Sequence, residues 1–324
     1  MVRHAALPLS ILATLVLAAC SPAEKKTEAP AASGATPAAA GNKKVAITAI
    51  VEHPALDAVR KGVLDELKAQ GFEEGKNLTV DFQSAQGSTA NAAQIAKKFA
   101  GDNPDVIVAI ATPSAQSVVA ATKTIPVVYS AVTDPVAAKL VSSWEPSGTN
   151  VTGVSDELPL EPQIDYSPGE VNSTTVLEQL KTKLGGQGLN VVAAPAQRSS
   201  DVLTAARSLQ GKVDLIYTSL DNNVVSSYES LYKAAVEMKT PLIAADTDSV
   251  KRGAVAALGV NYYDLGKKTG GVVVDVLKGK KAGEIPSSRI DAANLDLFVS
   301  KKNAAAAGIT VSEDVLKSAK EVQE

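Results

Sequence analysis

Cysteine is almost absent from this chain of 324 residues, in which Cys20 is the only one. Without a second thiol the chain cannot form an internal disulfide or a thiolate zinc site. Histidine is nearly as scarce, and His53 is the only one beyond residue 4. One histidine cannot build a histidine-rich metal centre, so we predict that the protein holds no metal and needs no cofactor.

The sequence also lacks the motifs of common enzyme classes. It contains no GxSxG nucleophile elbow, no P-loop and no GxGxxG after its first expected strand. No nucleophile has a base beside it in the sequence. A net charge of −3 without a cluster of Lys or Arg excludes the electrostatic footprint of a nucleic-acid-binding protein. These absences favour binding over catalysis, so we predict that the protein is not an enzyme.

Long apolar runs are missing except at the start of the chain. Arg3 and His4 precede the uncharged stretch 5–19, which ends in small residues directly before Cys20. A basic start, a short apolar stretch and small residues at a cleavage point are typical of an export signal, and the cysteine makes it resemble a bacterial lipoprotein signal. We predict that residues 1–19 are a signal peptide and that Cys20 is lipidated. An uncleaved anchor or a coincidental cysteine is the alternative.

The segment after the cysteine is rich in Ala, Pro, Ser and Gly and poor in large apolar side chains. Such a composition cannot bury enough surface to offset the entropy of ordering. We therefore interpret residues 20–42 as the lipidated cysteine followed by a disordered tether with a reach of roughly 25 Å. Lipid and tether would hold the protein on the periplasmic face of a bacterial membrane.

From residue 43 onward, short runs of β-formers alternate with helical patterns. In the first half we expect strands at 45–51, 77–83, 105–111 and 125–130, and helices at 56–70, after Ser88, and at 113–123. In the second half we expect helices at 173–184, 200–210, 224–238 and 264–278, strands at 189–194, 214–219, 241–245, 254–260 and near 295–299, and one or two final helices. This alternation predicts an α/β protein with parallel sheets.

The repeated pattern predicts two Rossmann-like lobes joined by a hinge of several chain segments. The stretch 144–162 is rich in Pro, Gly and Ser, and we interpret it as the first crossing between the lobes. We assign residues 43–153 and about 264–290 to the first lobe, and residues 154–262 and about 293–324 to the second. The crossings are expected near 153–157, 261–264 and 289–293.

Polar loops follow equivalent strands in the two halves. Residues 131–135 follow the strand at 125–130, and residues 246–249 follow the strand at 241–245. Open α/β sheets bind ligands at the carboxyl ends of their strands, so two such loops would form the walls of a cleft. The alternative is that each loop only caps the next helix.

Other loop residues suggest what such a cleft would bind. Thr112 and Ser114 flank a proline at a helix start, where free N–H groups would seat a carboxylate. On the opposite wall Asp221, and Asp246 or Asp248, could pair with an ammonium group. An anion seat facing carboxylates suits an α-amino acid, although helix capping remains the alternative for Thr112, Ser114 and Asp246.

His53 ends the first expected strand and is followed by Pro54. The ring could face the cleft and contact the ligand. The alternative is that the two residues only shape a turn.

Several stretches, in this order, resemble the TrpX-like substrate-binding lipoproteins of ABC transporters. They are VEHPALDAVRKG, EGKNLTVDFQSAQG, PDVIVAIATPSAQ, AVTDPVAA, GTNVTGVSD, YSPGEVNS, KVDLIYTSLDNNVV and PLIAADTDSVKRGAVAALGVNYYDLGKKTG. The likeness covers roughly residues 43–322. It implies a type I periplasmic-binding fold, a monomer that closes on a small ligand, most often an aromatic amino acid, and delivery to an ABC permease. At matching positions it implies a ligand-binding set of His53, Pro54, Thr112, Ser114, Thr133, Asp134, Ser167, Asn172, Asp221, Asn222, Asp246 and Asp248.

The resemblance fails at one place. Relatives have a helix and a buried strand before the loop that matches residues 166–170, whereas here residues 161–165 run straight into it. We therefore expect the second lobe to lack its first helix and strand. Each large side chain that no longer packs there removes roughly 1.5–3 kcal/mol of stabilisation. A degenerate copy that no longer binds is thus one alternative function; a sensor input module and an exported enzyme are the others.

Overall fold

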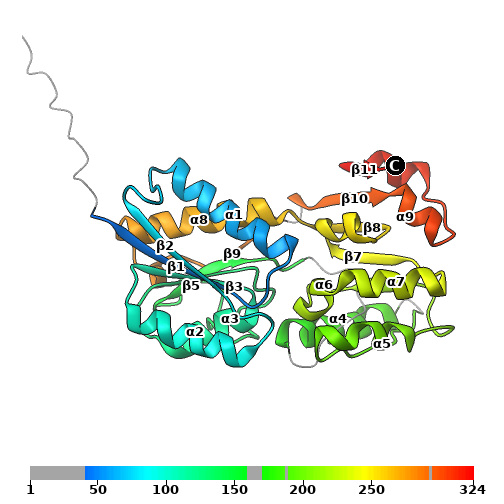
Figure 1. Cartoon of the computed structure of the whole chain (residues 1–324), viewed down its shortest axis with the longest axis horizontal. Coiled ribbons are helices and arrows are strands. Elements are labelled where there is room, and N and C mark those ends of the chain that lie inside the picture. Colours follow the sequence, from blue (N-terminus) through cyan, green and yellow to red (C-terminus); the bar gives the residue numbers. More distant parts are fainter. Residues whose placement is uncertain (1–40, 159–169, 187–188, 292–293) are drawn as a thin grey trace, which may run out of the picture. The chain divides into compact units, whose positions relative to one another are not determined.

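The computed structural model describes residues 41–158, 170–186, 189–291 and 294–324. The predicted signal peptide, Cys20 and the segment 159–169, which includes Ser167, lie outside the described residues. Residues 40–324 belong to one compact unit that contains two β-sheets (Figure 1). The predicted α/β class with two lobes of mainly parallel sheet is confirmed. The exact lobe limits given above remain a prediction.

The sheet of the first lobe has six strands in the order β2-β1-β3-β4-β5-β9, all parallel. Their bounds are β1 Lys43–Ala49, β2 Leu78–Ser84, β3 Val106–Ile110, β4 Val127–Ser130, β5 Val151–Ser155 and β9 Ser288–Arg289. Helices α1 (Pro54–Ala69) and α8 (Tyr262–Leu277) cover one face, and α2 (Thr89–Asp102) and α3 (Thr112–Ala121) cover the other. Because both faces are covered, the central strand β3 is a continuous apolar run.

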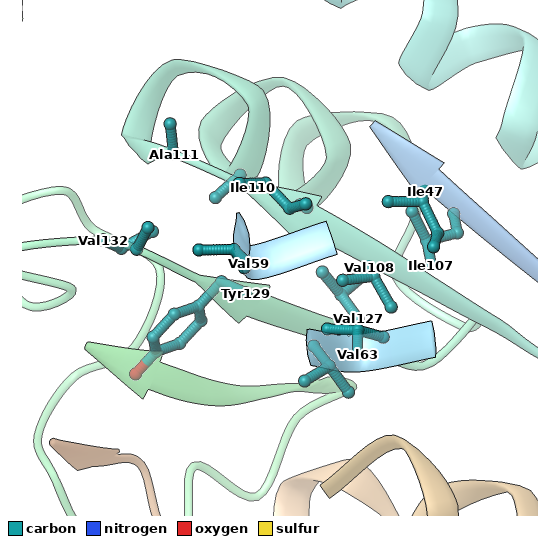
Figure 2. Close-up of a cluster of buried hydrophobic side chains, with 14 of the residues drawn as sticks. Ile47, Val59, Val63, Ile107, Val108, Ile110, Ala111, Val127, Tyr129 and Val132 are labelled. Carbon is teal, nitrogen blue, oxygen red and sulfur yellow. The ribbon is translucent and has the colours of Figure 1, made fainter. Parts of the chain in front are cut away.

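The core of the first lobe lies between this sheet and its helices. Figure 2 shows Val59 and Val63 of α1 beside Val108, Val127 and Tyr129 of the neighbouring strands, and all five side chains are fully buried. Side chains of this size stabilise the fold by roughly 1.5–3 kcal/mol each when they leave water. The core therefore holds the strand ends, and the loops that follow them, in fixed positions.

Helices α1 and α8 pack unusually closely because of glycine. A Cβ placed on Gly266 would lie 2.2 Å from the carbonyl oxygen of Val59, and one on Gly62 would lie 2.2 Å from the carbonyl oxygen of Tyr263. Only glycine allows two helix backbones to approach this closely. The last helix of the first lobe is thus fixed against the first one, although about 200 residues separate them in the chain.

The second lobe contains a five-stranded sheet in the order β11-β10-β8-β7-β6. Its strands are β6 Ile216–Thr218, β7 Leu242–Asp246, β8 Ala256–Val260, β10 Asp296–Ser300 and β11 Glu321–Gln323. Strands β6, β7 and β8 are parallel, whereas β10 runs antiparallel to β8. The helices are α4 Val171–Gly185, α5 Val202–Arg207, α6 Asn222–Ser226, α7 Tyr228–Met238, α9 Lys301–Ala306 and α10 Glu313–Ser318, with 3-10 turns at Ser199–Asp201 and Thr247–Arg252. A further 3-10 turn, Ala282–Glu284, belongs to the first lobe, where Ala282 is part of the core.

Two sequence predictions for strands are wrong. Strand β5 was missed, because its Thr152-Gly153 centre lies in a stretch rich in Pro, Gly and Ser, yet all five residues are buried inside the first sheet. The glycine is needed there, since a Cβ on Gly153 would lie 2.2 Å from the carbonyl oxygen of Tyr129. Conversely, residues 189–194 form no strand. Within the described residues the second sheet ends at β6, and this segment does not pair with it.

Other differences are smaller. The helix expected at 224–238 is broken at Ser227 into α6 and α7, and the helix expected at 200–210 is shorter. Ser88 caps α2 as predicted, by accepting a hydrogen bond from the N–H of Asn91. Within the part of the chain that the structure describes, the search for helices long and apolar enough to span a bilayer finds none.

Candidate functional site

The loops at the carboxyl ends of four strands lie along one edge of the first sheet. His53 follows β1, Thr112 follows β3, Thr133 follows β4 and Asp156 follows β5. Because β1, β3, β4 and β5 are parallel neighbours, these loops meet at the same edge. The second sheet supplies the loops after β6 and β7, which begin with Ser219 and Thr247.

Residues from both lobes line a small cavity of about 20 Å³, which we call the polar cavity. Its lining consists of His53, Ala55, Leu56, Ala131, Asp156, Asn172, Leu220, Asn222, Val225, Asp246 and Tyr262. A volume of this size holds one water-sized group. Four of the residues in the predicted ligand-binding set, His53, Asn172, Asn222 and Asp246, therefore come together here.

His53 is 8% exposed and forms a hydrogen bond with the Asn222 side chain, which belongs to the other lobe. Burial lowers the pKa of His53 to about 4, helped by the charge of Arg252, whereas the Asn222 contact acts in the opposite direction. The ring is therefore neutral at pH 7. The ring atom Nδ1 is buried and has no hydrogen-bond partner.

Asp156 is 2% exposed and was not predicted as a site residue. The hydroxyl of Tyr262 donates a 2.8 Å hydrogen bond to its Oδ2, while Oδ1 is buried without a partner. Burial raises the pKa of Asp156 to about 6, against smaller opposing contributions from the Tyr262 and Thr133 hydroxyls. Its pKa therefore lies close to neutral pH, because burial disfavours the ionised carboxylate.

Asn172 stands in the first turn of α4 and is 4% exposed. Its Nδ2 donates to Glu170 Oε2 and to the carbonyl oxygen of Leu220, both at 3.3 Å. These two acceptors fix the orientation of the amide, so Oδ1 is the atom left buried without a partner. Glu170 Oε2 also accepts from Asn222 Nδ2 at 2.8 Å. The Glu170 carboxyl therefore orients both amides.

A second cavity of about 20 Å³ adjoins the first and shares Asn172 and Leu220 with it. We call it the mixed cavity, because Leu158, Val176 and Leu220 lie there beside polar side chains. Its lining consists of Thr133, Asp134, Glu157, Leu158, Asn172, Ser173, Thr175, Val176, Gln179, Ser219 and Leu220. The predicted residues Thr133 and Asp134 are thus placed at this second cavity.

Three of the predicted acidic residues act as caps. Asp221 Oδ1 accepts from the N–H groups of Asn223 and Val224, and its Oδ2 accepts from Ser173. Asp246 accepts from the N–H and the hydroxyl of Ser249. Asp134 Oδ1 likewise accepts two backbone N–H groups at the start of a turn. The structure thus favours the capping interpretation over an ammonium contact for Asp221 and Asp246.

The remaining predicted residues lie around the cavities without lining them. Pro54 is the first residue of α1, and Asp248 is in the 3-10 turn after β7. Thr112 and Ser114 are buried in the first turn of α3, and Ser114 Oγ has no hydrogen-bond partner. The residue before this helix, Ala111, has a φ of 73°, a strained conformation for a non-glycine residue.

Sequence reasoning missed Asp156 and Leu220. Asp156 follows β5, but this strand was itself interpreted as a crossing segment, so the carboxylate was not recognised as a strand-end residue. Among the described residues, no group of three or more His, Cys, Asp or Glu side chains is placed to bind a metal ion.

Comparison with known proteins agrees with this architecture. The family model described as ABC transporter substrate binding protein matches residues 44–323. The tyrosine-binding protein of Clostridioides difficile is 40% identical over 264 residues, which cover 77% of this chain and 76% of that protein.

Two solved structures resemble this chain closely. A conserved domain protein from Vibrio cholerae superposes with a TM-score of 0.85 at 45% identity, over 87% of this chain and 100% of that one. A Streptococcus pneumoniae ABC protein in complex with L-Trp has a TM-score of 0.82 at 32% identity, with the same coverage. The predicted type I periplasmic-binding fold is confirmed.

Proposed function

The chain belongs to the family of ABC transporter substrate-binding proteins, and we propose that it captures an aromatic amino acid between its lobes and delivers it to an ABC permease. Members of this family are extracytoplasmic binding proteins and not enzymes. The observation that carries the proposal is the pair of adjoining cavities, which are lined from both lobes and whose lining residues include three with a buried, unpartnered polar atom.

The two cavities suit the two ends of such a ligand. The polar cavity and the first turn of α3, with the unpartnered Ser114 hydroxyl, would hold the charged groups of the amino acid. The mixed cavity would hold the side chain, because Leu158 and Val176 provide apolar contact and Gln179 a polar group. Two related proteins support an aromatic ligand, one named as tyrosine-binding and one solved with L-Trp.

Binding requires the lobes to move. A drug-sized ligand occupies a pocket of roughly 300 Å³ or more, whereas each cavity measures about 20 Å³. The ligand would therefore enter an open form, and closure would add contacts with the second lobe. The permease would recognise the closed, loaded form.

Calorimetry of the purified full-length chain in mild detergent, titrated with all twenty amino acids, tests this proposal. We expect heat and a raised melting temperature with L-Tyr, L-Trp or L-Phe, at a stoichiometry of one to one. A panel in which no amino acid gives heat would refute an amino-acid receptor. A sensor input module would also bind an amino acid. In that case a strain in which the gene is deleted would still take up the ligand, whereas loss of a transport receptor would abolish uptake.

We also propose that Cys20 carries a lipid and that the protein acts as a lipid-anchored monomer outside the cytoplasm. Support comes from the position of Cys20 after the apolar stretch and from the composition of residues 21–42. Cells fed with labelled palmitate should incorporate label into the wild-type protein and none into Cys20→Ser. Equal labelling of the two proteins would contradict the anchor.

A further inference from the structure

Three of the residues that line the polar cavity each have a buried acceptor atom without a partner: His53 Nδ1, Asp156 Oδ1 and Asn172 Oδ1. They come from three separate segments, namely the loop after β1, the end of β5 and the first turn of α4. A buried polar atom without a hydrogen bond is costly, and three of them around one small cavity require an explanation.

Each of the three atoms can only accept a hydrogen bond. The His53 contact with Asn222 favours the protonated ring, so the nitrogen in that contact is the donor, and Nδ1 of the neutral ring is left as an acceptor. The Asn172 amide is oriented by its two Nδ2 contacts. Asp156 Oδ1 belongs to a carboxylate whose other oxygen already accepts from Tyr262.

The charge around the cavity favours a cation. Asp156 and Asp246 both line it, and Arg252, whose charge acts on His53, is occupied by a bidentate pair with Glu229 and by the carbonyl oxygen of Val225. A neutral water would offer two donors to three acceptors, whereas a primary ammonium offers three donors and a positive charge. The volume of about 20 Å³ is sufficient for a group of that size.

We propose that the polar cavity is a primary-ammonium site, in which His53 Nδ1, Asp156 Oδ1 and Asn172 Oδ1 each accept one N–H of the bound amino acid. This inference rests on the proposed function and assigns the counter-ion to Asp156 in place of Asp221 or Asp246. Because His53 and Asp156 lie on the first lobe and Asn172 on the second, the ammonium group would bridge the lobes and favour closure.

A ligand series on the wild-type protein tests the site without any mutation. L-Trp is compared by calorimetry with 3-(indol-3-yl)propionate, which lacks the amino group, and with N,N,N-trimethyl-L-tryptophan, whose ammonium group carries no N–H; the des-amino analogue of L-Tyr gives a second pair. Sites that hydrogen-bond a substrate group reject analogues lacking it, so both analogues should bind at least about 100-fold more weakly. Affinities within about threefold of the parent amino acid would overturn the proposal.

A matched pair of variants identifies the counter-ion. Asp156→Asn should weaken L-Trp binding by about 10- to 100-fold, because a charge-assisted bond is lost, and should change binding of the des-amino analogue by less than about threefold. The control is Asp296, another buried carboxylate, which lies on β10 and pairs with Lys320. Asp296→Asn should keep the wild-type preference for L-Trp over the des-amino analogue. An Asp156→Asn protein that melts cooperatively and keeps the wild-type preference would overturn the assignment.

The two proposals fail in different ways. If no amino acid produces heat with the wild-type protein, the receptor function itself is wrong. If amino acids and their des-amino analogues bind equally well, the receptor function stands and only the ammonium site is wrong.

Discussion

Tyr262 and Asp156 connect the first turn of α8 to the end of β5 through a 2.8 Å hydrogen bond from the phenol to Oδ2. Both side chains are buried, and both line the polar cavity. They also stand where the chain passes between the lobes, since β5 precedes the first passage and α8 follows the return. A ligand that contacts Asp156 would therefore act on the hinge itself.

Replacing Tyr262 with Phe removes this bond and leaves a buried carboxylate oxygen unsatisfied. We expect Tyr262→Phe to lower the free energy of unfolding by about 1–3 kcal/mol and to weaken ligand binding. It should also raise the pKa of Asp156 further, because the phenol lowers that pKa at present. Denaturant titration and calorimetry measure the two effects.

The neighbouring residue provides the control for this change. Tyr263 donates an equivalent bond to Asp65 on the outer surface of α1. Tyr263→Phe should alter stability by less than about 0.5 kcal/mol and leave affinity unchanged. Equal effects of the two substitutions would mean that burial at the hinge has no special role.

Affinity for the amino acid should depend on pH in one direction. Burial raises the pKa of Asp156 to about 6 and lowers the pKa of His53 to about 4. Binding an ammonium group requires ionised Asp156 and neutral His53. As the pH falls through about 6, Asp156 takes up a proton in the closed form, and His53, whose ordinary pKa is 6.5, takes one up whenever the lobes open. Both events oppose binding.

We therefore expect a constant affinity from about pH 7 to 8 and, below about pH 6, a loss that approaches tenfold per pH unit for each of the two groups. The other titratable groups around the cavity are Asp246, Asp221, Glu170, Arg252 and Tyr262, of which Asp246 and Asp221 keep their capping bonds. Asp156→Asn should make the loss at low pH shallower, because only the contribution of His53 remains. An affinity that rises on acidification would contradict this assignment of charges.

Glu170 should make the wild-type protein less stable as the pH rises. Burial, and then the charge of Asp221, raise the pKa of Glu170 to about 8. The unfolded chain releases this proton near pH 4.5, so between pH 4.5 and 8 stability falls by up to about 1.4 kcal/mol per pH unit. Glu170→Gln keeps an acceptor for both asparagines and removes the titration, so its advantage in melting temperature should grow from pH 5 to pH 8.

The matched control lies on the same helix. Glu178 pairs with Lys181 at the surface and has a side chain that is 73% exposed. Glu178→Gln should melt with the same pH dependence as the wild type. If Glu170→Gln also follows the wild-type curve, the carboxyl group titrates normally in the folded protein.

The close contact of α1 and α8 can be tested with alanine. A methyl group on Gly266 would lie 2.2 Å from the backbone oxygen of Val59, so the helices must separate, and we expect Gly266→Ala to cost about 3 kcal/mol. Gly271 is in the same helix with nothing within 4 Å of its Cβ position. Gly271→Ala should stabilise the protein by up to about 1 kcal/mol. Opposite shifts in melting temperature are the expected result; a stabilising Gly266→Ala would disprove the contact.

Most of the first lobe could be predicted because each of its elements carries a strong local signal. The strand that became β3 is a continuous apolar run, and α2 has a capping serine at Ser88. Strand β5 carried no such signal. Its centre is polar and small, and it forms a strand only because the neighbouring β4 supplies hydrogen bonds and Tyr129 covers Gly153. Tertiary context decides the structure there.

The second lobe and the site were less predictable for a related reason. Residues 189–194 have the composition of a strand, but a strand needs a partner, and a composition does not reveal whether one is present. Similarly, the sequence pattern placed Asp221 and Asp246 at strand ends. It could not show that their carboxylate oxygens accept hydrogen bonds from the backbone N–H groups that follow, and so act as helix caps. Asp156 could be recognised only after β5 was known and its Oδ1 was seen to be unsatisfied.

The packing of α8 against α1 has a consequence for synthesis. Until residue 277 has left the ribosome, one face of the first sheet lacks the helix that fills the space around Gly62 and Gly266. A nascent chain of about 250 residues thus carries a half-covered apolar surface that invites aggregation. A truncation that removes α8 would leave this surface uncovered and so destabilise the amino-terminal lobe, although the break lies far from that lobe's other elements in the sequence.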